Sequence, residues 1–249
     1  MERDGYPNPP VTEAVFQLDF SEPIAWTVVT PAVIYQKLAD EYPLEPDQQE
    51  QVQAVFGSSG EGLSPEFSIN RSANRYIYRD ETKARLVVLS PTTVSVNSLR
   101  PYEGWPSLLQ RASRVTEVLE DLGIAPTIKQ VSLRYINQIR LGSGVVDLDD
   151  YVTIPVRAAA FDGAAVGAFV NRTESILTDG TRVNITFASV APPVGDQDTA
   201  NVILDIDCVR HLEPSVSTSD ALAVAGDLKT LENHQFEALI TDECRRLFK

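Results

Sequence analysis

The chain has 249 residues, 43% of them hydrophobic and 22% charged, and its formal net charge is −14 at pH 7. This composition is typical of a globular protein and excludes a disordered or fibrous one, while the acidity argues against bulk binding of DNA, because phosphate contacts supply most of that affinity. Its apolar runs are far shorter than the roughly 20 residues that cross a bilayer, so we expect no membrane partner.

The first half of the chain predicts a strand, a helix, a meander and a second helix. Residues 11–20 alternate apolar and polar side chains as a strand does, and Thr30 before Pro31 marks the start of a helix over about 31–41. An apolar stripe predicts a helix over about 105–122. Meander strands are expected at 51–56, 67–71, 75–78, 85–90 and 93–98, with turns at 58–60 and 80–82.

The second half repeats this order. A long strand is expected over 128–141 and a closing helix over about 220–247. Asp179-Gly180 predicts a hairpin turn between the first two of three intervening strands. These strands are expected at 165–176, 182–190 and 201–210, with a helical turn at 147–151 and a loop tip at 192–196.

These elements predict an α+β fold of curved antiparallel sheets with long helices packed on one face. We interpret the repeated order as an internal duplication of a β-α-β(n)-α unit, with halves at 1–125 and 126–249 in one compact unit. The order of elements is similar to the TBP-like and helix-grip arrangement. Because fold does not fix function, the site has to be argued from particular residues.

Charge is distributed unevenly along the chain. Residues 71–140 hold 11 Lys and Arg against 6 Asp and Glu, a net charge of +5, whereas residues 1–70 and 141–249 carry −10 and −9. An anionic ligand or an acidic partner surface would therefore dock on this basic segment. Several of its basic residues share strand parity and would line one face if the turns keep the register, although a solvated sheet face is the alternative. They are Arg71, Arg75, Arg79, Lys83 and Arg85.

The candidate ligand-binding residues are four arginines and two aromatic residues of this segment. The aromatic rings could stack on bases between the arginines, or they could pack in the core. The set comprises Arg75, Arg79, Arg85, Arg134, Tyr76 and Tyr78. Two further polar residues have a structural interpretation. Glu13 and Arg134 are expected on the face opposite the core, as a mutual ion pair or as separate ligand contacts, and Asn137 as a buried amide that ties down backbone or as part of a ligand pocket.

Catalytic signatures are missing from the sequence. Cys208 and His211 lie three residues apart in a strand and so point to opposite faces, which argues against a nucleophile and base. No phosphate-binding loop motif occurs, and the glycines of 57–62 favour a hairpin loop. Asp205, Asp207 and His211 could hold Mg²⁺ or Mn²⁺ for a nuclease, but we predict neither a metal nor another cofactor.

Two cysteines, Cys208 and Cys244, occur in a chain whose acidic start lacks a secretory signal, so we expect reduced, buried thiols and a cytoplasmic protein.

Three landmarks carry a resemblance to a known family. They are the run Tyr6 to Val15 (YPNPPVTEAV), the run Leu133 to Asn137 (LRYIN), and a C-terminal helix with His234, Phe236 and Ile240 to Asp242. Together they resemble a sporadically distributed bacterial family of unassigned function. The resemblance implies a bacterial cytoplasmic protein, from a multi-gene cluster of mobile or defence type, and implies no catalytic residues.

Two functions are consistent with these observations. The leading hypothesis is a non-enzymatic binding or interaction protein with a protein partner or a second copy of itself, because catalytic motifs are missing and the charge is divided. The alternative is a sensor or enzyme that acts on RNA or an anionic nucleotide through the basic central strands.

Overall fold

The computed structural model describes residues 5–58, 65–124, 126–144, 146–158, 160, 166–190 and 199–249. The turn predicted at 58–60 lies mostly outside these residues, and the loop tip at 192–196 wholly outside them. The side chain of Arg71 is likewise not among the described ones.

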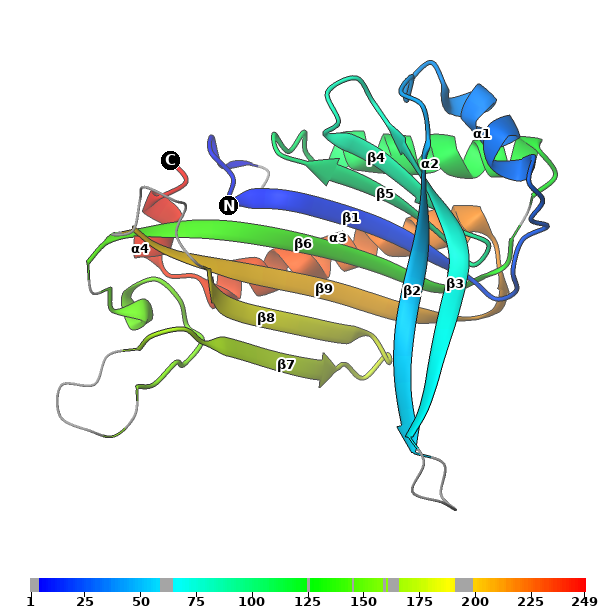
Figure 1. Ribbon diagram of the computed structural model, residues 1–249. Helices are drawn as coiled ribbons and strands as arrows, with labels where there is room; N and C mark the ends of the chain where they lie inside the picture. Colours follow the sequence, from blue (N-terminus) through cyan, green and yellow to red (C-terminus); the bar gives the residue numbers. More distant parts are fainter. Residues whose placement is uncertain are drawn as a thin grey trace.

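Nine strands of the described residues form one antiparallel sheet in the order β2-β3-β4-β5-β1-β6-β9-β8-β7 (Figure 1). The strands are β1 (Val11–Phe20), β2 (Asp47–Ser58), β3 (Pro65–Arg79), β4 (Arg85–Leu89), β5 (Thr93–Leu99), β6 (Ile128–Ser143), β7 (Val170–Ile176), β8 (Arg182–Val190) and β9 (Thr199–Val216). The α+β class with an antiparallel sheet is therefore confirmed.

The two strands predicted most clearly from alternation lie at the centre of this sheet. β1 and β6 pair with each other, with Phe16 opposite Leu133. The apolar residues of both strands are buried on the same face, because alternate side chains of a strand point the same way. We call the other face, which carries Glu13 and Arg134, the open face.

Helices cover the apolar face. The helices are α1 (Thr30–Leu38), α2 (Trp105–Asp121), α3 (Thr218–Leu239) and α4 (Asp242–Arg246), and a 3-10 turn spans Leu148–Asp150. α2 and α3 lie behind the sheet in Figure 1 and contribute their buried stripes to one core shared with β1 and β6. Among the described residues no helix is both long and apolar enough to cross a membrane.

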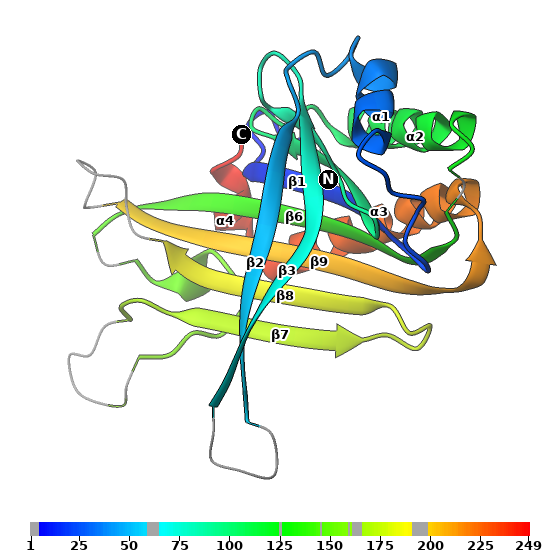
Figure 2. The same ribbon diagram turned by 45° about the vertical axis from the view of Figure 1, so that its right-hand side comes forward.

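β2 and β3 leave the direction of the other strands. β3 pairs with β4 only through Tyr76 to Arg79, whereas it pairs with β2 along nearly its whole length. The resulting two-stranded ribbon crosses on the side of the sheet away from α3 (Figures 1 and 2). The sequence predicted two short strands here, at 67–71 and 75–78, and the structure has one long strand.

The closing helix also differs from the prediction. It is not continuous over 220–247, because Ile240 is extended and α4 starts anew after Thr241. The Thr241 side chain accepts a hydrogen bond from the Cys244 N–H, and its own N–H donates to Tyr151 O (3.0 Å). These contacts replace the helical bonds that would have carried the chain through.

Candidate functional site

The structure separates the candidate arginines onto two faces. Arg79 lies opposite Leu86 in the β3–β4 ladder, so Arg85 has the parity of Tyr78 and not of Arg79. Arg75 lines a polar pocket on the open face, whereas Arg85 lines a pocket beside α2. The predicted shared face is thus wrong for Arg85, because the turn 80–84 shifts the register.

Each of these arginines also has a partner. Arg75 donates two hydrogen bonds to Gln49 Oε1 (3.1 and 2.8 Å), and Arg79 pairs with Asp47. Arg85 pairs with Glu103, whose hydrogen bond is the main reason that the pKa of Arg85 is raised. Each of the three guanidinium groups is thus already engaged by a neighbouring side chain, through exposed contacts of the kind that contribute about 0–1 kcal/mol each.

One prediction paired Arg134 with Glu13, and this pairing is wrong. The guanidinium of Arg134 binds Asp205 through two parallel hydrogen bonds of 2.8 and 2.6 Å, across the β6–β9 ladder. Glu13 instead accepts from Asn97 Nδ2 at 2.8 Å on the neighbouring strand β5. Glu13 and Arg134 nevertheless line the same open-face pocket, of about 390 Å³. The sequence placed both on the correct face but could not give the partner, which depends on strand order.

The candidate aromatic residues pack on the helix side. Tyr78 is 0% exposed, donates its hydroxyl to Pro31 O (3.1 Å) and stacks on Tyr35. Tyr76 is half-buried and its ring lies 6.0 Å from the ring of Trp26. Of the two alternatives, base stacking and core packing, the structure places Tyr78 in the core.

Asn137 is fully buried on the helix side of β6. Its Nδ2 donates to Leu204 O (2.9 Å) on β9 and to Tyr135 O (3.4 Å). The amide therefore ties down the backbone of two adjacent strands, as one of the two interpretations proposed.

The acidic residues of β9 do not form a metal site with His211. Within the described residues no three His, Cys, Asp or Glu side chains are placed to hold a metal ion. Asp205 is occupied by Arg134, and His211 lies four residues beyond Asp207, about 13 Å along the strand. The pKa of Asp207 is raised by burial, although the charge of Arg134 opposes the shift.

The helix side holds a second cluster of arginines, which we call the arginine pocket. It is a hollow of about 470 Å³ beside α2, lined by Arg85, Arg111, Arg114, Ser107, Gln110, Ser113, Glu41 and Glu117. The α2 residues of this set share one side of the helix, because they recur three or four positions apart. Three arginines and two serines thus line one space, although Glu103 already binds Arg85 and accepts a hydrogen bond from the Ser107 hydroxyl (2.7 Å).

Arg111 is the unusual member of the arginine pocket. It is only 6% exposed, and its Nη1 donates to Asn97 O (3.1 Å) and, at 3.5 Å, to the buried Tyr42 hydroxyl. Its Nε and Nη2 atoms are buried without a hydrogen-bond partner. Among the described residues it forms no ion pair with a carboxylate, which leaves a buried cation uncompensated by charge.

The neighbouring charges are held loosely. Arg114 lies 3.8 Å from Glu41 and 3.9 Å from Glu117, at the outer limit of an ion pair, and Glu41 and Glu117 are exposed. Burial raises the pKa of Tyr42, whereas the hydrogen bond from Arg111 opposes that shift. The phenol therefore stays neutral at physiological pH and supplies no counter-charge to Arg111.

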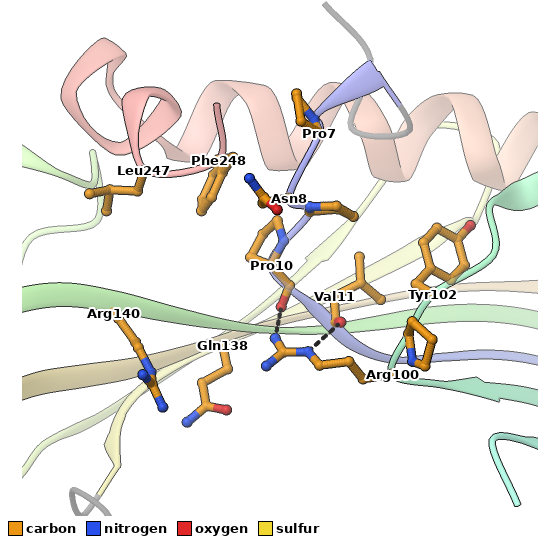
Figure 3. Close-up of a pocket in the computed structure, with 12 residues that line it drawn as sticks. Pro7, Asn8, Pro10, Val11, Arg100, Tyr102, Gln138, Arg140, Leu247 and Phe248 are labelled. Atoms are coloured by element: carbon orange, nitrogen blue, oxygen red, sulfur yellow. Dashed lines mark hydrogen bonds between the residues drawn. The ribbon is translucent and has the colours of Figure 1, made fainter. Parts of the chain in front are cut away.

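A further pocket, which we call the terminal pocket, lies where the N-terminal segment, β6 and the C-terminus meet (Figure 3). It measures about 480 Å³ and has an apolar wall that includes Pro10, Tyr102 and Phe248. Arg100 donates to Pro10 O (3.3 Å) and Val11 O (3.5 Å), as the dashed lines of Figure 3 show.

Of the landmarks of the resemblance, the first lines this terminal pocket, and it pairs with the second through Val11 opposite Asn137. Asn8 N–H donates to Phe248 O (3.0 Å), and Gln138 N–H donates to Pro10 O (2.9 Å). Tyr6 donates its hydroxyl to Glu237 (3.0 Å), which also binds Arg245. Contacts that fasten the N-terminal run to both β6 and the last helices give these sequence features a structural explanation.

Sequence reasoning noted Arg111 and Arg114 only as members of the basic segment. The signal that would have found them is the polar stripe of α2, in which Ser107, Arg111 and Arg114 run beside the apolar stripe. A scan against protein-family models and a search of curated proteins each gave no match for the chain.

Proposed function

We propose that the protein is a non-enzymatic binding protein that holds a small oxyanion, such as a phosphate group, in the arginine pocket. The observation that carries this proposal is the buried Arg111 guanidinium, which has two unpartnered nitrogens and no carboxylate partner within the described residues. This proposal retains a binding protein as the leading function. It also moves the anionic ligand of the alternative hypothesis from the open face to the helix side.

Energetics support an anion as the missing partner. A buried donor without a hydrogen bond costs about 1–3 kcal/mol, and a charged one costs more. An oxyanion beside Arg111 would offset this cost, because it supplies both acceptors and negative charge. Because the Nε and Nη2 atoms are buried, the guanidinium has to rotate toward the space that Arg111 lines for a ligand to reach them.

The rest of the lining narrows the class of ligand. Arg114, held only loosely by Glu41 and Glu117, adds a second guanidinium, and Ser113 adds a hydroxyl, a combination that suits a tetrahedral oxyanion. Arg85 and Ser107 border the same space but are already bound to Glu103. Glu41 and Glu117 are exposed members of the same lining and would repel a long polyanion. We therefore expect a single phosphate or a phosphomonoester rather than RNA.

Calorimetric titration with inorganic phosphate and with a panel of nucleoside monophosphates tests the proposal. Wild type should bind, and Arg114→Gln should weaken binding by about tenfold or more, because one charge-assisted contact is lost. Arg140→Gln is the matched control, since it removes the same charge in the terminal pocket. Equal affinity in wild type and Arg114→Gln, or loss in Arg140→Gln alone, would reject the site.

We also propose the duplication, the family and the cellular location that the sequence predicted. An internal duplication of a helix-grip type is supported by strand order, since β1 pairs with β5 before α2, and β6 pairs with β9 before α3. Membership of the sporadic bacterial family is supported by the pairing of its first two landmarks in the β1–β6 ladder, where Val11 lies opposite Asn137. A cytoplasmic setting is supported by two buried cysteines without a disulfide, of which Cys244 has a pKa raised by burial to about 12.

Gene neighbourhood tests the family and its multi-gene context. Neighbours of mobile or defence type beside genes that share all three landmarks would support it. The same landmarks in unrelated, scattered contexts would contradict it.

A further inference from the structure

β7 is an exposed edge of the sheet. Among the strands that the structure describes it pairs with β8 alone, and it forms the outer border of the sheet in both views (Figures 1 and 2). Almost all of its residues are exposed, and the apolar side chains at its two ends are 75% exposed at Val170 and 66% exposed at Ile176. The free side of such a strand presents backbone N–H and C=O groups that another strand can pair with.

The sequence of β7 is complementary to itself in the antiparallel sense. With Thr173 on a two-fold axis, Val170 of one chain lies opposite Ile176 of a second copy, and Arg172 lies opposite Glu174. The four residues alternate along the strand and so share one face. The axis generates each pair twice, which gives two apolar pairs and two ion pairs around a central threonine.

The two charges are available for this pairing. Neither Arg172 nor Glu174 takes part in an ion pair or side-chain hydrogen bond with the described residues. In the β7–β8 ladder they lie opposite Thr186 and Asn184, and the charge of Arg172 acts on Asp207, which places both residues on the open face. Charges of one sign protect an edge from its own copy. Arg172 and Glu174 do not protect β7 in this way, because each lies opposite the other when two copies pair.

We propose that two copies of this chain associate through antiparallel pairing of β7 with β7, in the register centred on Thr173, to form one sheet that continues across both subunits. The partner is a second copy because the charge and apolar order of β7 match their own reversal. A seven-residue edge contact between chains of net charge −14 gives a weak association that strengthens when salt screens the overall repulsion. The proposal is independent of the arginine pocket.

Sedimentation velocity over about 1 to 500 µM, a range suited to weak pairs, measures the association. Wild type should shift from monomer to dimer with concentration. Arg172→Glu alone and Glu174→Arg alone should each weaken self-association at least about fivefold, because like charges then lie opposite each other. An equimolar mixture of the two variants should associate again, since both cross-chain charge pairs of the mixed dimer become complementary.

A crosslinking experiment fixes the register. Under oxidising conditions Thr173→Cys should form a disulfide-linked dimer, because the two copies of this position face each other on the axis, whereas Ser175→Cys should crosslink far less. Both native cysteines are buried and do not compete. A monomer at every concentration, a dimer unaffected by either charge reversal, or a mixture that fails to restore association would overturn the proposal.

Discussion

Replacement of Arg111 by methionine tests the claim that this buried guanidinium destabilises the ligand-free protein, because two of its nitrogens lack hydrogen-bond partners. The change removes two unpartnered buried nitrogens, which relieves about 1–3 kcal/mol each. It also removes the bond to Asn97 O, which costs about 1.5–3 kcal/mol, and the longer bond to the Tyr42 hydroxyl, which costs about 0.5–1.5 kcal/mol. The difference between the mid-range values is a gain of about 1 kcal/mol. At about 2–4 °C per kcal/mol for a chain of this size, Tm should rise by about 2–4 °C.

Urea unfolding and calorimetry in a phosphate-free buffer measure this effect. Arg245→Met is the matched control, because all three guanidinium nitrogens of Arg245 are occupied by Glu237 and Asp242, and this variant should lose about 1–3 kcal/mol. If Arg111→Met also lost 2 kcal/mol or more, Arg111 would be a satisfied structural residue and the reasoning would fail.

The remaining predictions concern the sheet and the helices. Since burial raises the folded-state pKa of Asp207, its contribution to stability is present below about pH 3.8, the unperturbed value, and is lost as pH rises through the raised pKa. Asp207→Asn should therefore have a higher free energy of unfolding than wild type in urea at pH 7, and this difference should disappear toward pH 4. Asp205→Asn should be less stable than wild type, because Arg134 loses its partner. An Asp205→Asn variant more stable than Asp207→Asn at pH 7 would contradict the account. Ser217→Ala should cost about 1 kcal/mol of unfolding free energy, because the cap on the Asp220 N–H is lost, and an unchanged midpoint would refute the cap. Phe236→Ala should cost about 3–5 kcal/mol, and a loss below 1 kcal/mol would mean that this ring does not belong to the core.

Local sequence patterns predicted the elements that depend on local chemistry. The alternation of 11–20 and 128–141 gave the two central strands, and Thr30-Pro31 and Asp179-Gly180 gave a helix start and a hairpin turn that the structure contains. Gly180 has a φ of 79°, a conformation that glycine adopts without strain. Such features need no knowledge of strand order.

The candidate site depended on tertiary register, which local patterns do not carry. Arg85 changed face because the turn before β4 sets the pairing of Arg79 with Leu86. Arg134 found Asp205 because β9, distant in sequence, lies beside β6. Arg111 became a candidate only because the structure buries it, and the sequence did not predict this burial, since an arginine on a helix is ordinarily solvated.

The most direct measurement is a phosphate titration followed by the side-chain Nε–H resonances of ¹⁵N-labelled arginines. The account predicts saturable shifts for Arg111, Arg85 and Arg114, with one common affinity, and no saturable shift for Arg210, which does not line this pocket and is paired with Asp179 and Asp227. A small, linear drift shared by all arginines, or an Arg111 signal unmoved at saturating phosphate, would contradict an anion site in the arginine pocket.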